Sequence, residues 1–508
     1  MSGVYLLLVV AVVGVPLYYL TPAAYRRYTL LAISCGYILL ACQSLFVYLL
    51  YSGALCFAGG RWLSATVSQK PGKDLDRGQK KAFRAKLGRI ALGKLTLLVA
   101  LQLAPLLLLK YFGMARAMQH AVAAVLPAPK VLLPIGISYY TLLGISYLID
   151  VKRRAVAPGS FLQVLGYITY FPALLEGPLT RYGDLSPQLT AGNAFCYSDF
   201  CRGLQLILWG LFQKLVVADR VAVLVSGVLR NPGDFAGSVV ALAAVGFVVQ
   251  LYFDFCGCID IARGCSALFG VTLAQNFDQP FAATTISGFW QRWHMSLGAF
   301  LRDYIFYPVS LCPPVAWLRG ALSRRGFQRT AGVVTGIIAS FFVWTAMGLW
   351  HGDGYKYFVY GMYYFALQSL GNIYQNSPLG RFGAPAWLGR CRTFVLVCFG
   401  MLLFYAPTPA AAGGMLWQVI TRFQPSGLLP GLAAISLKPV DWGVLALGVG
   451  LRTGISAARS RGVDLRGKIA ALPTPVSFVI WYGAIFAIII LGAYGFGWGG
   501  ADPLYGQF

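Results

Sequence analysis

The chain has 508 residues, of which 58% are hydrophobic and 11% are charged. Several apolar runs approach the roughly 20 residues that cross a bilayer as a helix, so the composition excludes a string of soluble domains and predicts one polytopic membrane protein. The net charge of +25 comes from 41 Lys and Arg against 16 Asp and Glu. In a membrane protein these residues gather in cytoplasmic loops, and we therefore exclude nucleic acid as a partner.

The N-terminal part of the sequence sets the predicted orientation. The first apolar run, Val4–Leu20, has no basic segment before it and is followed by further spans, so we interpret it as a retained signal anchor. Spans are also predicted near 28–42 and 45–62. The hydrophilic segment Ser64–Lys94 then carries nine Lys and Arg against two Asp. The positive-inside bias predicts a cytoplasmic loop here, and an N-terminus outside the plasma membrane.

The middle of the chain combines regular helices with a broken segment. Helices are predicted near 95–112, 131–149, 199–228 and 236–269, with His120 in an outer loop. Residues 166–185 are apolar but interrupted by Pro172, Gly177 and Pro178. Irregular backbone at membrane depth is tolerated only when it is buried in protein or lines a cavity.

Three carboxylates, Asp219, Asp254 and Asp260, fall in or beside these apolar helices. Carboxylates in such places are costly and usually face a wet interior or a partner. Lys214 and Arg220 lie close by in the sequence, so we expect structural ion pairs rather than catalytic groups.

The last third of the chain adds further predicted spans, near 331–349, 355–375, 393–406, 441–453 and 476–495. Basic loops are expected between them, at 319–329, 380–392 and 452–468. With re-entrant pieces, we expect about 11 to 13 membrane segments in a single integral membrane domain over residues 1–508.

The 11 cysteines do not follow the spacing of a disulfide scaffold. Most lie in apolar runs, and the Cys256–x–Cys258 pair has no second pair to complete a metal site. We expect small buried thiols and no metal.

One short segment, residues 289–304, predicts an amphipathic helix. At about 100° per residue, Phe289, Trp293 and five more apolar residues share one stripe, and Arg292, Ser296 and Arg302 lie opposite. The helix is too charged to span, so it is expected at the cytoplasmic interface. His294 falls at the edge of the stripe, where it could be a functional group or merely cap the apolar face.

A second histidine, His351, directly follows an apolar run and is surrounded by Gly348, Gly352 and Gly354. Glycines permit close approach of a backbone or a substrate. A neutral imidazole can act as a general base near pH 7, although an interfacial histidine in an aromatic belt would look the same. The sequence has no G-x-S-x-G elbow, phosphate-binding loop or zinc-ligand spacing.

Two motifs resemble the histidine regions of the membrane-bound O-acyltransferase family: "SGFWQRWHMSLGAFLRDYIFYP" (287–308) and "MGLWHG" (347–352). The similar branch contains the alginate O-acetyltransferases and the D-alanyltransferases of teichoic acid. Further motifs extend the resemblance, in order, over most of residues 134–365. They include "GYITYFPALLEGPLTRY" (166–182) and "NFDQPFAATTISGFW" (276–290).

The resemblance implies an all-α membrane fold whose helical core, 131–375, has a tunnel or funnel, with N-terminal spans over 1–130 and C-terminal spans over 376–508. It implies His351 as the catalytic residue and His294 as a catalytic residue on the donor side. The co-substrate would be an acyl thioester, on coenzyme A or a carrier protein, at the cytoplasmic face. No tightly bound cofactor is implied.

The acceptor implied by the resemblance is a hydroxyl of an extracytoplasmic polysaccharide or teichoic-acid-type polymer, reached directly or through a partner acyltransferase. Both acetyl and D-alanyl transfer fit the branch, and the long C-terminal part favours acetyl. The sequence departs from the branch at Tyr364, where many members have a histidine, and at Glu176, where a small or apolar residue is usual.

Four further residues are candidates for substrate binding. Arg292 and Arg302 suit a phosphopantetheine phosphate or an acidic carrier, or are solvated interfacial charges; Trp293 and Trp350 flank the histidines. At 1.5 Å per residue, the run 331–349 would carry His351 across the bilayer from His294. The alternatives to an enzyme are a transporter or flippase without covalent chemistry, and a scaffold that docks a carrier protein.

Overall fold

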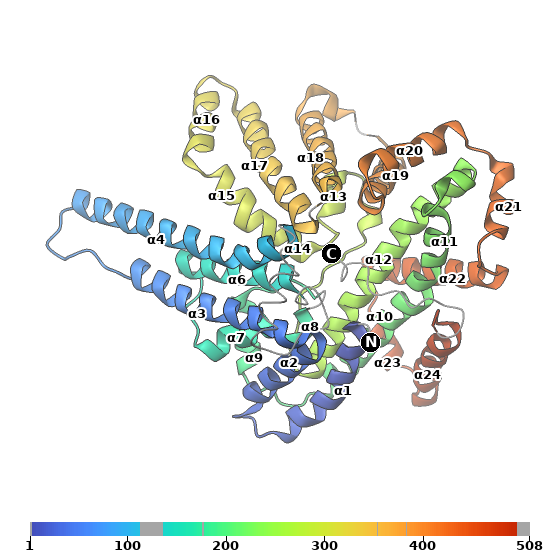
Figure 1. Ribbon diagram of the computed structural model, residues 1–508, viewed down its shortest axis with the longest axis horizontal. Helices are drawn as coiled ribbons and strands as arrows, with labels where there is room; N and C mark the ends of the chain where they lie inside the picture. Colours follow the sequence, from blue (N-terminus) through green and yellow to red (C-terminus); the bar gives the residue numbers. More distant parts are fainter. Residues whose placement is uncertain (1–2, 112–135, 175–176, 353, 383, 495–508) are drawn as a thin grey trace. The chain divides into compact units, whose positions relative to one another are not determined.

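A computed structural model describes residues 3–111, 136–174, 177–352, 354–382 and 384–494 of the chain (Figure 1). These residues form helices and turns, without a strand among them. Five helices are long and apolar enough to cross a membrane: Arg77–Lys110, Gly237–Leu268, Gln328–His351, Ala386–Tyr405 and Thr474–Leu491. The predicted all-α polytopic membrane protein is confirmed.

The chain divides into two compact units, residues 1–205 with 262–274 and residues 206–261 with 275–508. The helices of the first unit are α1 (Gly3–Leu20), α2 (Arg26–Cys42), α3 (Val47–Val67), α4 (Arg77–Leu106), α6 (Ile137–Arg153), α7 (Phe161–Thr169), α8 (Phe171–Leu174) and α9 (Tyr182–Thr190). Helix α10 (Tyr197–Leu211) begins in this unit. Helices α3 and α4 lie side by side, and α6 packs against both (Figure 1).

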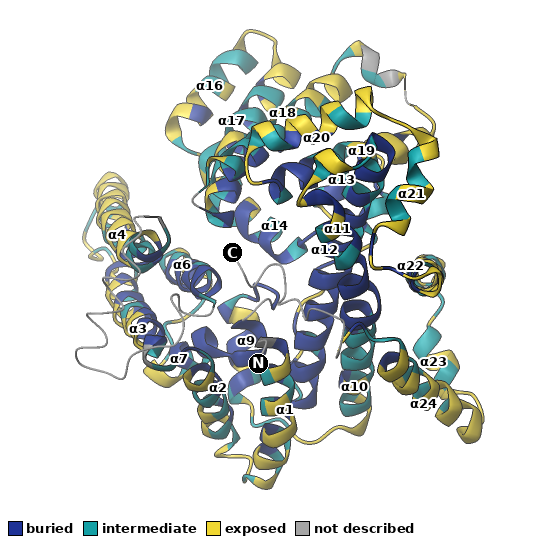
Figure 2. Ribbon diagram, turned by 45° about the vertical axis from the view of Figure 1, so that its right-hand side comes forward, coloured by how far each residue is buried: buried dark blue, intermediate teal, exposed yellow. Residues whose placement is uncertain are grey.

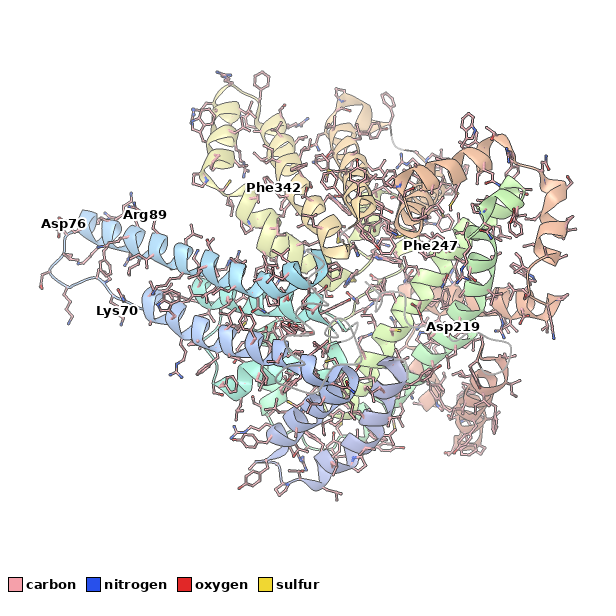
Figure 3. The ribbon with its side chains drawn as sticks, in the orientation of Figure 1. Lys70, Asp76, Arg89, Asp219, Phe247 and Phe342 are labelled. Carbon is pink, nitrogen blue, oxygen red and sulfur yellow. The ribbon has the colours of Figure 1, made fainter. Side chains whose placement is uncertain are left out.

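The predicted hydrophilic loop Ser64–Lys94 is mostly helical, which corrects the expectation. Only residues 68–76 separate α3 from α4, and Lys70 and Asp76 mark this tip (Figure 3). The Asp76 side chain accepts a hydrogen bond of 2.7 Å from the Gln79 N–H, while the Gln79 side chain accepts from the Asp76 N–H. This capping box starts α4, and the Lys and Arg residues that follow are good helix formers.

The predicted break within 166–185 is confirmed. Helices α7 and α8 are short and end before Pro178, and Phe171 and Leu174 are fully buried. The backbone polar groups of this stretch therefore lie inside protein, as irregular membrane segments require. Glu176, His120 and the start of the predicted span 131–149 lie outside the described residues.

The second unit contains the two histidine motifs. After α12 (Gly237–Leu268), which the two units share, its helices are α13 (Ile286–Trp290), α14 (Met295–Leu301), α15 (Tyr307–Ser310), α16 (Pro313–Arg324), α17 (Gln328–His351), α18 (Tyr355–Asn376), α19 (Ala386–Tyr405), α20 (Pro409–Thr421), α21 (Leu428–Ala433), α22 (Pro439–Ser460), α23 (Leu465–Ala470) and α24 (Thr474–Leu491). α11 (Asp219–Leu229) precedes them. The predicted basic loop 319–329 is largely the end of α16, a second correction.

Burial differs sharply between the long helices of this unit. Helix α12 is buried along most of its length, whereas α24 is exposed on nearly all sides (Figure 2). An apolar helix with so little protein around it requires lipid as its solvent.

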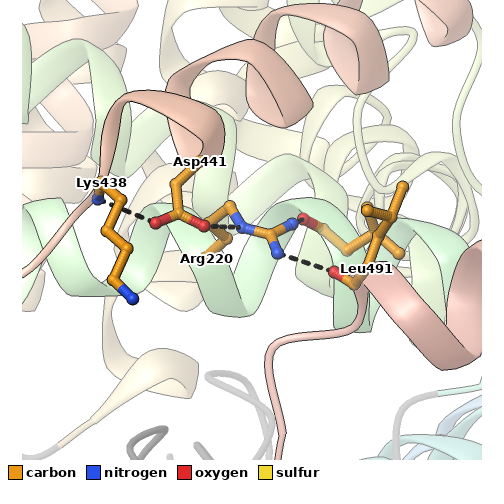
Figure 4. A network of polar contacts seen from close by, with 5 residues as sticks. Arg220, Lys438, Asp441 and Leu491 are labelled. Atoms are coloured by element: carbon orange, nitrogen blue, oxygen red, sulfur yellow. Dashed lines mark hydrogen bonds and ion pairs between the residues drawn. The ribbon is translucent and has the colours of Figure 1, made fainter.

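Most of the buried charges form the predicted ion pairs, and Asp260 accepts a hydrogen bond from a neutral amide. Lys214 Nζ lies 2.8 Å from an Asp219 oxygen and 2.7 Å from an Asp254 oxygen, and Gln213 donates to Asp260 at 3.0 Å. Arg220 pairs with Asp441 of α22 at 3.0 Å and also donates to the Leu491 carbonyl at 2.8 Å (Figure 4). These contacts tie the C-terminal helices α22 and α24 to α11.

Candidate active site

His294 lies in a sharp turn and not on a continuous helix, so the predicted helix over 289–304 is wrong. Helix α13 ends at Trp290 and α14 starts at Met295, while His294 itself has φ 47° and ψ 53°, in the left-handed region. The segment after α12 causes the break: the Asn276 carbonyl accepts from the Met295 N–H at 2.9 Å, and the Asp278 N–H donates to the Arg292 carbonyl at 3.0 Å. These bonds satisfy backbone groups that a helix would otherwise pair internally.

The His294 ring is buried, with 2% of its surface exposed, and does not cap an exposed apolar face. The edge of the ring meets Phe255 of α12 at 4.8 Å between centroids, and Nδ1 lies 3.1 Å from the Asn276 amide nitrogen. His294 lies outside the five apolar helices. Burial lowers its pKa to about 3, because the charged imidazolium is poorly solvated there.

His351 is the last residue of α17 and is 3% exposed. Its ring is enclosed by aromatic side chains, with Tyr360 of α18 at 5.8 Å and Phe404 of α19 at 5.1 Å between centroids. Gly348 allows α18 to pack closely against α17, because a Cβ at this position would lie 2.5 Å from the Tyr357 carbonyl oxygen. The close approach expected from these glycines is thus made by α18.

Trp350 is a neighbour of both histidines. The centroid of its indole lies 6.3 Å from that of His294 and 5.0 Å from that of His351. This corrects the expectation that α17 separates the histidines by the thickness of a bilayer. The His294 turn contacts the C-terminal end of α17, and both rings belong to one site.

A cavity of about 680 Å³ adjoins His294. Its wall includes the indoles Trp290, Trp293 and Trp344 together with Gln368 and Arg302. The volume is that of a typical small-molecule site, and the wall combines aromatic faces with amide groups.

The four predicted substrate-binding residues lie in different environments. Trp293 and Arg302 line the cavity, and Trp350 bridges the two histidines. Arg302 has 57% of its side chain exposed and pairs with Asp303 at 3.0 Å. Arg292 is exposed and is not among the residues of the cavity wall.

The sequence indicated no role for the residues that hold the indoles of the cavity wall and the His294 ring in place. Tyr364 is fully buried and stacks on Trp344 at 5.3 Å between centroids, so it supports the cavity wall. Trp344 donates from its indole to Gln368 at 3.0 Å. Asn276 contacts His294 from 18 residues away in the sequence, and only its place in the motif at 276–290 could have drawn attention to it.

The described residues contain no group of three His, Cys, Asp or Glu side chains that could hold a metal ion. The 11 cysteines are free thiols. Five of them are buried, namely Cys42, Cys56, Cys256, Cys258 and Cys265, and four are half-buried, namely Cys35, Cys201, Cys312 and Cys398.

Comparison with known proteins finds similarity in the middle of the chain. The family model of the membrane-bound O-acyltransferases matches residues 129–314, which include His294 but end before His351. A probable alginate O-acetylase of Pseudomonas fluorescens is 33% identical over 293 residues, 56% of this chain and 54% of the relative.

Two further relatives are named for other activities. A peptidoglycan O-acetyltransferase of Helicobacter pylori is 26% identical over 54% of each protein. A teichoic acid D-alanyltransferase of Bacillus subtilis is 28% identical over 53% of this chain and 68% of the relative. The chain spans about half the length of the alginate O-acetylases that it matches. Residues 129–314 of this membrane protein thus match the model of the membrane-bound O-acyltransferase family.

Proposed function

We propose that the protein is a membrane O-acyltransferase. It moves an acyl group from a cytoplasmic thioester to a hydroxyl of an extracytoplasmic polysaccharide or cell-wall polymer. The observation that carries this proposal is the pair of buried histidines joined by Trp350 beside a cavity of about 680 Å³. The names of the relatives support it, since each is an O-acetylase, O-acetyltransferase or D-alanyltransferase.

His351 acts as the general base in this reaction. Its neutral imidazole accepts the proton of the acceptor hydroxyl as that oxygen attacks the thioester carbonyl carbon. The new C–O bond forms, the C–S bond breaks, and the leaving sulfur takes the proton from His351. The products are an ester and a free thiol, so the step is balanced and requires no metal or redox partner.

The cavity beside His294 receives the acyl donor. Arg302 at its wall pairs with a phosphate of the coenzyme A or phosphopantetheine arm, because guanidinium groups bind phosphate through two parallel hydrogen bonds. Acetyl is the transferred group, in keeping with the O-acetylases among the relatives.

The test uses the full chain, purified in detergent, with two labelled donors: acetyl-coenzyme A and a D-alanyl carrier protein. Each is offered with a uronate polysaccharide, peptidoglycan or teichoic acid. Ester-linked acetyl on one of these polymers supports the proposal. Detergent removes the two compartments that transport needs, so a transporter or a docking scaffold would form no ester, and that result would overturn the proposal.

A further inference from the structure

Asn276 forms a clamp between His294 and the start of α14. The residue is 1% exposed. Its side-chain oxygen lies 2.9 Å from the Ser296 backbone nitrogen and 2.9 Å from the Ser296 hydroxyl, and its amide nitrogen lies 3.1 Å from His294 Nδ1. The Asn276 carbonyl also accepts from the Met295 N–H. The side chain and the backbone carbonyl of Asn276 are therefore both hydrogen-bonded to the His294 turn.

The contacts fix the orientation of the amide. A backbone N–H can only donate, so the Asn276 atom that faces the Ser296 nitrogen is the oxygen. That oxygen has two lone pairs, and the two groups of Ser296 occupy them. The Asn276 oxygen lies 3.3 Å from His294 Nδ1, which is farther than the 3.1 Å between the Asn276 amide nitrogen and the same atom.

The orientation of the amide in turn selects one tautomer of the histidine. The amide NH₂ group only donates, so His294 Nδ1 must accept and therefore carries no proton. In a neutral imidazole, the single proton then resides on Nε2.

We propose that Asn276 is a positioning residue that holds His294 as its Nε2–H tautomer, and that His294 is a hydrogen-bond donor to the thioester carbonyl oxygen and not a base. This inference rests on the proposed function for its reaction. The two histidines then have different tasks, since His351 moves a proton and His294 does not. As the acceptor oxygen attacks, the carbonyl electron pair moves onto the carbonyl oxygen, and the Nε2–H group stabilises that negative charge.

Substitution of Asn276 by Asp separates this role from packing. An aspartate has nearly the same shape and still accepts both bonds from Ser296. It presents a second oxygen to Nδ1, however, which requires the proton there and leaves Nε2 without one. Since removal of one such donor typically costs about 10²–10³-fold in kcat, N276D is expected to lose activity in that range. The exposed Asn376 provides a control, and N376D should retain the wild-type rate.

The chain suits a direct measurement of the tautomer because it has only three histidines. In ¹⁵N-histidine-labelled protein, a protonated and an unprotonated ring nitrogen give well-separated signals, and the H294Q spectrum assigns those of His294. We expect Nε2–H in the wild type and Nδ1–H in N276D.

Several results would overturn the inference. Nδ1–H in the wild-type spectrum would do so even if N276D fails to fold. Wild-type kcat in N276D with the inverted tautomer would also do so, as would equal activity of H294A and H294Q, because the Gln amide can still donate from the position of Nε2. A wild-type protein that transfers no acyl group but has the expected tautomer would instead refute the proposed function.

Discussion

The arginines near His294 illustrate how position decides a role at the scale of single residues. Arg302 lines the cavity, whereas Arg292 is exposed outside its wall and contributes its backbone carbonyl to the turn. The two residues carry the same charge ten positions apart, so they form a matched pair for a test of donor binding.

R302A is expected to raise the KM for acetyl-coenzyme A about tenfold with little change in kcat, since a charge-assisted contact to phosphate contributes about 1.5–3 kcal/mol at most. The exposure of Arg302 reduces this value. R292A should leave both constants within twofold of wild type. Steady-state kinetics with the donor varied distinguish the two, and an equal effect of both substitutions would indicate a general electrostatic contribution.

The burial of His294 predicts that the stability of the protein depends on pH. Burial lowers its pKa to about 3, so its ring stays neutral in the folded protein while the same ring in an unfolded chain takes up a proton near pH 6.5. Acid therefore favours unfolding through this residue as the pH falls below about 6.5. The ¹⁵N signals of His294 should not change between about pH 8 and 5. A titration centred near 6.5 would mean that water reaches the ring.

At the scale of elements, the long apolar runs and the break within 166–185 were predictable from the sequence, whereas the break at the His294 turn was not. The predicted helices 236–269 and 331–349 correspond to α12 and α17 within three residues at each end. The break at 291–294 depends on bonds from Asn276 and Asp278, which no local pattern reveals. Hydropathy predicts loops at the charged segments 64–94 and 319–329, because it measures polarity and not helix propensity.

The closeness of α17 and α18 depends on glycine. G348A would place a Cβ 2.5 Å from the Tyr357 carbonyl oxygen and force the helices apart, so we expect a loss of about 1–3 kcal/mol and lower activity. Gly332 of the same helix has nothing within 4 Å of its Cβ position, and G332A should be neutral or slightly stabilising. Thermal unfolding in detergent compares the two. Equal stability of both variants would contradict the packing.

At the scale of the whole molecule, the C-terminal helices complete the unit that contains both histidines. Arg452 of α22 donates to the Tyr252 hydroxyl at 2.7 Å, and Tyr252 contacts Trp293 at 6.0 Å between centroids. The motifs in the sequence singled out both histidines as candidate site residues, and their roles stay a prediction. The sequence could not predict that one indole joins the two histidines, because this contact brings together residues 56 positions apart.

Substitution within the Arg220–Asp441 ion pair provides the strongest test of whether α22 is anchored to α11. D441N leaves a buried guanidinium without its carboxylate, which is expected to destabilise the protein by about 3–5 kcal/mol. The pair of Arg202 with Asp199 is about 42% exposed, so R202A should cost less than about 1 kcal/mol. Unfolding midpoints in detergent measure both, and a D441N midpoint equal to that of R202A would show that α22 is not anchored by this pair.

The role proposed for His351 is that of the base in an O-acyl transfer. The most direct measurement is the single-turnover rate of ester formation from ¹⁴C-acetyl-coenzyme A by purified wild-type protein, H351A and H120A, on the polymer that the wild type modifies. General-base catalysis predicts that H351A is slower by about 10²–10⁴-fold while it still binds the donor, and that H120A matches the wild type. Ester formation by folded H351A at the wild-type rate would contradict the account.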